Sequence, residues 1–166
     1  GGINARPSIR VLEQDNACAL MDGDRAMGQV SGTLAMEKAI SLAKQYSVGA
    51  VSLRRGSHFG AAGYFSAMAV EKDCIGIAIS NTTAMMAPTG GSEPVIGNNP
   101  ISIAVPSSGD FPSVLDIALS ISSQAKLMVA REQGKPIPPG LALDPNGEPT
   151  NDPPAALAGT VLPVGG

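Results

Sequence analysis

The only histidine of the chain, His58, lies in a glycine-rich stretch that reads Gly-Ser-His-Phe-Gly-Ala-Ala-Gly over residues 56–63. An imidazole can give and take a proton near neutral pH, so histidine is the commonest general acid–base residue. Gly56 and Gly60 let the backbone turn sharply and approach another group closely. A titratable side chain on such a turn is typical of a reaction site. A histidine that only hydrogen-bonds its own loop fits the same spacing, so both interpretations stay open.

Two predicted elements flank this stretch and would position His58. Residues 48–53 are rich in β-branched and apolar side chains, which predicts a buried strand. The apolar spacing from Tyr64 to about Asp73 predicts an amphipathic helix. Other elements are predicted around them: strands at 8–13, 17–21 and 74–80, and a helix ending near Gln45 that Ser31 or Thr33 would cap.

After residue 80 the alternation of strands and helices stops. Residues 81–99 form a long loop with glycine and proline, and loops of this length are usually functional or disordered. The elements predicted beyond it are strands at 101–105 and 114–118, and a helix at 122–132 with Ala125, Met128 and Val129 on one face. Residues after Gly134 are rich in proline and glycine and leave little room for long elements.

The order of elements predicts the fold class. Strands that follow strands argue against a fully parallel, doubly wound sheet. The dinucleotide fingerprint G-x-G-x-x-G is absent at every predicted strand-to-helix junction. The sequence therefore predicts a non-Rossmann α+β fold, with a mixed, mainly antiparallel sheet and two or three packed helices. Its length of 166 residues predicts a single domain over 1–166.

Composition narrows the classes of partner. The net charge is −3 with no basic stripe, which argues against nucleic-acid binding. No run is long and apolar enough for a membrane span, and no signal peptide is recognised. Charged residues make up only 15% of the chain, against about 25% in ordinary soluble domains, so we expect another subunit or more chain to cover part of the surface.

The two cysteines, Cys18 and Cys74, lie in apolar strand-like runs. Two cysteines without further ligands make neither a disulfide scaffold nor a metal site, so no metal is expected. Both are expected to be buried, reduced thiols. A cytoplasmic location follows from this expectation.

A series of motifs occurs in one order along the chain. They are Ser57-His58-Phe59-Gly60-x-x-Gly63-Tyr64, Ala87-Pro88-x-Gly90-Gly91, Gly97-Asn98-Asn99-Pro100, Asp116-Ile117-Ala118-Leu119-Ser120, Ile137-Pro138, Pro149-Thr150-Asn151-Asp152-Pro153 and Leu162-Pro163-x-Gly165-Gly166. The series resembles the malate/L-lactate dehydrogenase family of non-Rossmann NAD(P)-dependent oxidoreductases, which includes ureidoglycolate dehydrogenase, diketogulonate reductase and piperideine-carboxylate reductase. Family members are about twice as long, and the chain is similar to their central portion.

The resemblance implies roles for individual residues. His58 matches the proton acceptor in the oxidation of a 2-hydroxy acid, and Thr82 matches a cofactor-contacting hydroxyl. Residues that match cofactor-contacting segments, or the pocket wall beside them, are Gly97, Asn99, Pro100, Asp116, Ile117 and Ala118. The implied cofactor is NAD or NADP, and the implied assembly is a homodimer. Family segments that complete the active site would lie before Gly1 and after Gly166, so this fragment is expected to hold an incomplete site.

The resemblance implies an oxidoreductase that transfers a hydride between NAD(P) and a small 2-hydroxy acid or 2-oxoacid such as malate or lactate. One alternative is a cyclic-imine or diketo-acid reductase of the same family, which the same histidine would serve. Another alternative is a truncated, non-catalytic domain that acts in binding or assembly.

Four other residues or pairs have a chemical interpretation beside a structural one. A guanidinium binds carboxylates in a bidentate manner, so Arg55 is a candidate for a substrate carboxylate, whereas Arg54 is expected to be solvent-exposed charge. Met85-Met86 is expected to line a pocket or the core. Asp152, before a proline, is expected in a turn.

Overall fold

The computed structural model describes residues 2–165, which divide into two compact units. Unit 1 contains the chain up to Ala78 together with Ser102–Asp116, and unit 2 contains Ile79–Ile101 and the chain from Ile117 onward. No helix among residues 2–165 is both long and apolar enough to cross a membrane. The single domain expected from the length stays a prediction, and the two units are described separately here.

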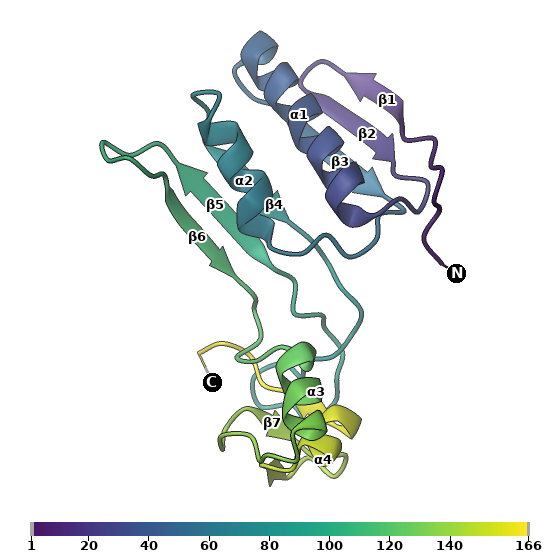
Figure 1. Cartoon of the computed structure of the whole chain (residues 1–166), viewed down its shortest axis with the longest axis vertical. Helices are drawn as coiled ribbons and strands as arrows, with labels where there is room; N and C mark the ends of the chain where they lie inside the picture. The colour runs from purple at the N-terminus through teal and green to yellow at the C-terminus, as the bar shows by residue number, and fades with distance from the viewer. Residues whose placement is uncertain (1, 166) are drawn as a thin grey trace. The chain divides into compact units, whose positions relative to one another are not determined.

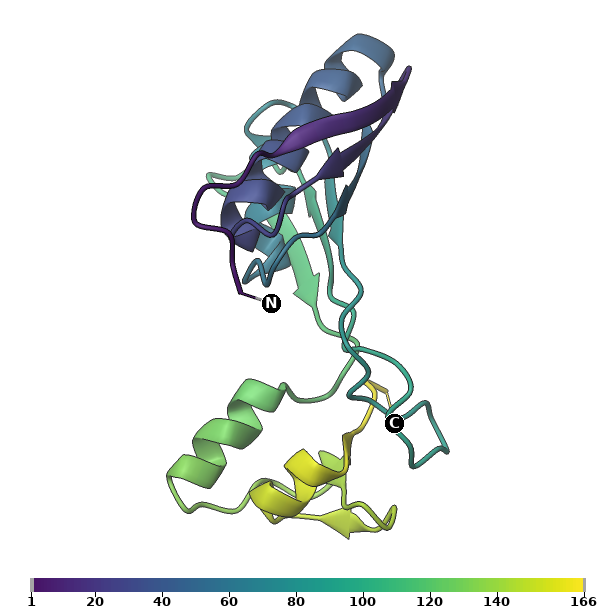
Figure 2. The ribbon, with the colours of Figure 1, turned by 90° about the vertical axis from the view of Figure 1, so that its right-hand side faces the viewer.

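Unit 1 begins with a three-stranded sheet in the order β1-β2-β3 (Figure 1). β1 (Arg10–Asp15) and β2 (Cys18–Asp22) form an antiparallel hairpin, and β3 (Ala50–Arg54) pairs with β2 in parallel. A parallel pair needs a crossover, and α1 (Gly28–Tyr46) provides it. α1 contacts both β2 and β3 along one side of this sheet (Figure 2).

α1 begins earlier than the sequence predicts, and neither predicted cap is correct. Met27 is the N-cap, and Ser31 and Thr33 lie inside the first turns. Their hydroxyls donate to carbonyl oxygens four residues back, Ser31 to Met27 at 3.3 Å and Thr33 to Gln29 at 2.8 Å. A helical serine or threonine can bond in this way instead of capping, so residue type alone did not locate the start of the helix.

α2 (Ala62–Val70) packs against α1 and against a second sheet in the order β4-β5-β6. These strands are β4 (Gly76–Ile79), β5 (Ile101–Val105) and β6 (Ser113–Ile117). Close packing depends on two glycines: a Cβ at Gly32 of α1 would lie 2.7 Å from the Phe65 ring, and a Cβ at Gly76 would collide with the Ser66 carbonyl. α2 therefore lies against both neighbours at backbone distance.

Unit 2 has its own apolar core. Its elements are α3 (Gln124–Glu132), β7 (Ala142–Leu143), β8 (Pro149–Thr150), α4 (Pro153–Ala158) and β9 (Thr160–Val161). β7 pairs antiparallel with both β8 and β9. The buried side chains that meet in the core are those of Met86, Leu127, Ile137, Ala142, Ala156 and Val161. Met85 packs against this cluster, so the methionine pair is core in this unit.

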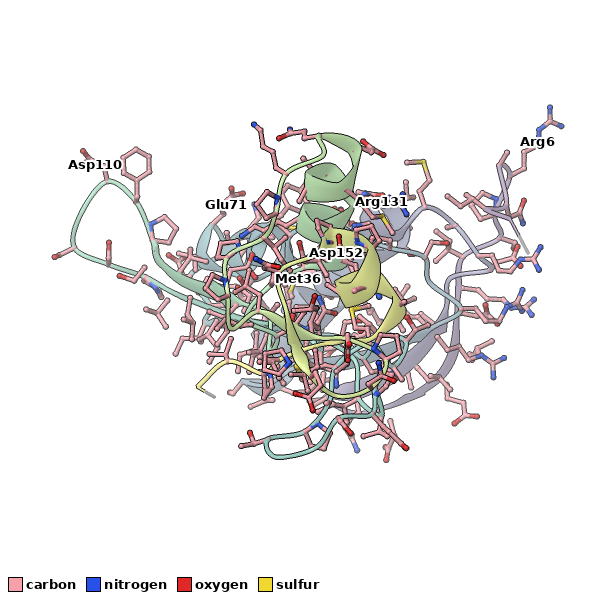
Figure 3. All side chains as sticks on the ribbon, turned by 90° about the horizontal axis from the view of Figure 1, so that it is seen from below. Arg6, Met36, Glu71, Asp110, Arg131 and Asp152 are labelled. Atoms are coloured by element: carbon pink, nitrogen blue, oxygen red, sulfur yellow. The ribbon has the colours of Figure 1, made fainter. Side chains whose placement is uncertain are left out.

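The α+β, non-Rossmann class with a mainly antiparallel arrangement is confirmed, and most predicted strands lie within a few residues of their observed places. The short helix α4 was not predicted. Asp152 caps it by accepting the amide hydrogen of Ala155 at 3.1 Å, so this aspartate begins a helix rather than a turn (Figure 3). Proline at the first helical positions suits this start, because its missing N–H would be unpaired there.

The burial prediction for the cysteines was wrong, and the apolar face predicted for α3 is not its buried face. In α3 the buried residue is Leu127, while Ala125, Met128 and Val129 are exposed. Cys18 is exposed and Cys74 is half-buried, and both are free thiols. A short helix has several apolar stripes of similar strength, so only packing decides which one faces the core.

Leu127→Ala should lower the free energy of unfolding by about 2–5 kcal/mol, because it leaves a cavity in the unit 2 core. Leu127 is 1% exposed, whereas Val129, on the same helix, is 49% exposed. Val129→Ala is the matched control and should change the stability by no more than about 0.5 kcal/mol. Urea denaturation followed by circular dichroism measures both, and a larger loss at Val129 would contradict the assigned face.

Candidate active site

His58 lies in unit 1, in the irregular segment 55–61 that links β3 to α2. The backbone turns at two positive-φ positions, Arg55 (55°) and Gly60 (85°). Glycine adopts such a conformation without strain, whereas an arginine there needs support from its surroundings. His58 itself is exposed, which leaves its imidazole accessible to a small molecule.

The start of the segment is held by a four-residue ion-pair cluster. Asp22, at the end of β2, accepts hydrogen bonds from the guanidinium groups of Arg54 and Arg55, each at 3.2 Å. Arg55 also donates to Asp24 at 2.7 Å. Backbone bonds reinforce the contact, because the amide groups of Gly23 and Arg25 donate to the carbonyl oxygens of Arg54 and Arg55. Support for the positive-φ Arg55 therefore comes from both its backbone and its side chain.

This cluster changes the interpretation of the two arginines. The Arg54 side chain is 55% exposed, as expected, but its guanidinium also pairs with Asp22. Arg55, the candidate for a substrate carboxylate, pairs with Asp22 and Asp24 of the chain itself. The Asp22 side chain is only 2% exposed. A buried carboxylate that lost its cations would carry an uncompensated charge, so the arginines serve the fold.

The carboxylates of the cluster are stabilised in their charged form. The pKa of Asp22 is lowered, first by the backbone N–H of Asp24, and then by the hydrogen bond of Arg54 and the charges of both arginines, against the opposing effect of burial. The pKa of Asp24 is also lowered, first by the backbone N–H of Ser8 and then by Arg55 and Asn4, again against burial. The two carboxylates therefore stay charged to a lower pH than an unperturbed aspartate would.

The middle of the segment rests on the N-terminus of α1. A Cβ at Gly28 would collide with the carbonyl oxygens of Ser57 and His58, so only glycine permits this approach. Gly28 is buried, and it is the first residue of α1. The backbone of His58 is therefore backed by a helix, while its side chain is exposed.

The end of the segment is tied to β6. Asp116 accepts the backbone N–H of Gly63 through Oδ2 at 2.7 Å, at the first turn of α2. Nearby, Ser66 and Ser102 share a hydroxyl hydrogen bond of 2.7 Å, and Ser102 donates to the Leu115 carbonyl at 2.7 Å. Of the predicted catalytic and cofactor-binding residues, unit 1 contains His58 and Asp116.

The remaining predicted residues lie in unit 2, where three of them meet. The Thr82 amide donates to Asn99 Oδ1 at 2.9 Å, and the Thr82 hydroxyl donates to Asn98 Oδ1 at 2.9 Å. The Thr82 hydroxyl also accepts the Asn98 amide at 3.1 Å. A Cβ at Gly97 would collide with the Thr82 hydroxyl, so this glycine permits the contact.

Pro100, Ile117 and Ala118 flank this cluster along the chain. The Pro100 carbonyl accepts the Ser80 amide at 3.2 Å, which extends the pairing beyond β4 and β5. The Asn98 carbonyl accepts the Leu119 amide at 2.7 Å, which brings the stretch after β6 beside the asparagine pair. Asn98 belongs to the Gly97-Asn98-Asn99-Pro100 motif but is not among the predicted site residues, and its side chain proves central to the cluster. The sequence signal that could have identified Asn98 is the pair of adjacent asparagines after Gly97.

The donor set in unit 2 fits a nicotinamide dinucleotide. The side-chain oxygens of Asn98 and Asn99 both accept from Thr82, and no hydrogen bond of their side-chain N–H groups is found among residues 2–165. Neutral amide donors bind phosphate, ribose or carboxamide oxygens without adding charge. Thr82 is exposed and both asparagines are half-buried, so the donors are fixed at the surface.

A family model for malate/L-lactate dehydrogenase matches residues 1–166, the whole chain. The chain belongs to this family. The malate/L-lactate dehydrogenase family thus accounts for the order of motifs found in the sequence, and it agrees with the non-Rossmann arrangement of strands.

Curated members of the family are similar along most or all of the chain. The L-sulfolactate dehydrogenase of Methanocaldococcus jannaschii is 45% identical over 166 residues, which are 100% of this chain and 48% of the relative. The ureidoglycolate dehydrogenase (NAD(+)) of Escherichia coli K12 is 37% identical over 100% of this chain and 47% of the relative. The (2R)-3-sulfolactate dehydrogenase (NADP(+)) of Chromohalobacter salexigens is 42% identical over 78% of this chain and 39% of the relative.

Solved structures of the family share the fold. The sulfolactate dehydrogenase from M. jannaschii matches with a TM-score of 0.85 at 44% identity, over 99% of this chain and 47% of that one. The delta1-piperideine-2-carboxylate reductase from Pseudomonas syringae matches with a TM-score of 0.90 at 27% identity, over 99% of this chain and 50% of that one. The chain spans about half the length of the curated relatives it matches.

The charge cluster beside His58 predicts a pH-dependent effect of Asp22→Asn. A pKa that is lowered by folding means that the carboxylate stabilises the fold above its unfolded pKa of about 3.9, and that this contribution is lost as the pH falls through the folded-state pKa. The variant should therefore be less stable than the parent at pH 7, and the difference should shrink as the pH falls below about 4.

Urea denaturation at pH 7 and pH 3 measures this difference. Asp110→Asn is the control, because Asp110 lies in the exposed loop between β5 and β6, with no hydrogen-bond or ion-pair partner of its side chain among residues 2–165 (Figure 3). A stability difference for Asp22→Asn that grows on acidification would contradict the assignment.

Proposed function

We propose that the chain is part of an NAD(P)-dependent oxidoreductase that transfers a hydride between the cofactor and a small 2-hydroxy acid or 2-oxoacid such as malate or lactate. The observation that carries this proposal is the family match over all 166 residues. Relatives named as sulfolactate and ureidoglycolate dehydrogenases support this substrate class, and the names of two of them, which specify NADP(+) and NAD(+), support NAD or NADP as the cofactor.

His58 is the proposed proton-transfer residue. It is the only histidine of the chain, it is exposed, and the backbone around it is held by contacts at Asp22, Gly28 and Asp116. In oxidation it takes the hydroxyl proton of the 2-hydroxy acid, and in reduction it returns that proton to the carbonyl oxygen. A nicotinamide dinucleotide supplies the hydride chemistry when it is bound.

The proposed cofactor contacts are Thr82, Gly97, Asn99, Pro100 and the segment Asp116–Ala118. The fixed amide donors beside Thr82 support this assignment, because they are neutral and held in place by hydrogen bonds within the chain. A preorganised polar group loses little freedom on binding, which raises affinity. Either NAD or NADP is compatible with these neutral donors.

One other function has specific support. The similarity to a piperideine-carboxylate reductase structure favours reduction of cyclic imines, in which His58 would protonate nitrogen rather than oxygen. A non-catalytic binding or assembly domain stays the second alternative, and turnover by the chain would contradict it. The homodimer and the cytoplasmic location stay predictions; the low charge content of 15% supports a covered surface.

His58→Ala should lower the rate of hydride transfer by about 10²–10⁴-fold, the usual contribution of a general acid–base residue. The measurement is NADH and NADPH absorbance with a panel of 2-oxoacids and cyclic imines. His58→Gln is the matched variant, since it keeps a polar side chain of similar reach but cannot transfer a proton at neutral pH. An unchanged rate in both variants would refute the role of His58, and no turnover or cofactor binding by the parent chain would refute the enzyme proposal.

Thr82→Ala should weaken cofactor binding about 5-fold, because the loss of one net hydrogen bond, about 1 kcal/mol, loosens Asn98. Titration of NADH and NADPH fluorescence measures the dissociation constants. Thr83→Ala is the control, since Thr83 is exposed and its side chain has no hydrogen bond among residues 2–165. Equal affinities of the Thr82 variant and the parent would argue against Thr82 as a cofactor residue.

A further inference from the structure

We propose that Asp116 is a positioning residue for His58: its side-chain carboxylate fixes the start of α2, and through it the segment that carries the imidazole. The inference rests on the proposed function of His58 and deepens it. It assigns the carboxylate of Asp116 a role within the chain, while contact with the cofactor falls to the backbone of this segment and to Ile117 and Ala118.

The start of α2 needs an acceptor that its own sequence does not provide. The first amide groups of a helix have no partner within the helix, and a capping side chain usually accepts one of them. The N-cap of α2 is Ala61, which has no side-chain oxygen. Asp116 Oδ2 fills this place by accepting the Gly63 amide at 2.7 Å, from a strand 53 residues away in sequence. A negative charge there also suits the positive end of the helix dipole.

Gly63 is matched to this contact. A Cβ at Gly63 would lie 2.8 Å from Oδ2 of Asp116, closer than Cβ atoms approach such atoms in proteins, and 3.3 Å from Cβ of Asp116, which is tighter than most such contacts. The glycine in the motif His58-Phe59-Gly60-x-x-Gly63 is therefore explained by the carboxylate that approaches it. This gives a sterically defined pair, Gly63 and Asp116, at the end of the histidine segment.

A second tie joins the same two elements. The buried hydroxyls of Ser66 and Ser102 bond each other, and Ser102 donates to the carbonyl of Leu115, the residue before Asp116. Both ties therefore begin at adjacent residues of β6 and reach α2 at Gly63 and Ser66, one helical turn apart. Loss of Asp116 alone would leave the serine tie in place, so α2 should stay packed while its first turn becomes mobile.

The geometry of the segment makes His58 sensitive to that mobility. Only four residues lie between His58 and Gly63. The other supports are at Arg55, on the N-terminal side of the histidine, and at Gly28, which lies against the carbonyl groups of Ser57 and His58, so Asp116 is the support on the C-terminal side. A catalytic group displaced by about 1 Å can lose about 10²-fold in rate. Asp116 therefore acts on catalysis through the backbone, whereas a residue that contacts the cofactor acts on its affinity.

The test compares Asp116→Ala, which removes the acceptor, with Asp116→Asn, which keeps an oxygen acceptor but removes the charge. Asp110→Ala, in the exposed loop between β5 and β6, is the control. We expect Asp116→Ala to lower kcat by about 10–100-fold with the cofactor KM within about 2-fold, and Asp116→Asn to recover most of kcat. A rise in cofactor KM with an unchanged kcat, or no recovery by asparagine, would overturn the proposal.

Two NMR measurements keep this test independent of turnover. In Asp116→Ala, the Gly63 amide should exchange at least about 10-fold faster and the His58 ring signals should shift or broaden. Asp116→Asn and Asp110→Ala should leave both close to the parent. If the parent chain shows no turnover, the proposed function fails while these signals still decide the positioning role. An unchanged Gly63 amide or an unchanged His58 ring in Asp116→Ala would overturn it.

Discussion

The candidate site depends on holding an irregular backbone segment still while leaving its histidine exposed. The segment between β3 and α2 lies outside the helices and strands, so its conformation must come from other elements. Three of them supply it: Asp22 and Asp24 at the end of β2, Gly28 at the start of α1, and Asp116 of β6. Each contact acts on backbone, or on an arginine beside it, and none uses the imidazole.

This arrangement separates the groups that build the site from the group proposed to react. Arg54 and Arg55 precede His58 by four and three residues, and the carboxylates of Asp22 and Asp24 balance their charge. A buried carboxylate with two guanidinium partners holds its geometry, because losing both cations would leave an uncompensated charge. If the substrate is an acid, as proposed, groups other than these arginines would recognise it.

In unit 2 the proposed cofactor contacts are neutral side chains rather than charged ones. Thr82 bonds the side-chain oxygens of Asn98 and Asn99 and accepts the backbone amide of Asn98, and Gly97 permits the close approach. Neutral amides can bind a dinucleotide without selecting for or against an extra phosphate. Family members whose names specify NAD(+) and NADP(+) agree with a donor set that leaves this choice open.

Sequence alone determined the class of fold, the order of most elements and the likeness to the malate/L-lactate dehydrogenase family, and it singled out His58 as the candidate proton-transfer residue. These follow from local signals: apolar periodicity, turn residues, and short motifs in a constant order. It did not locate the start of α1, the buried face of α3 or the helix capped by Asp152. Those depend on which of several comparable local patterns packs against a partner.

The tertiary structure alone decided what the charged residues do. Asp22 and Arg55 are 33 residues apart in sequence, and Gly63 and Asp116 are 53 apart, so no local pattern pairs them. The same aspartate can bind a cofactor, cap a helix or close an ion pair, and its neighbours in space select among these roles. Sequence could identify the histidine, but only the fold shows which groups hold it.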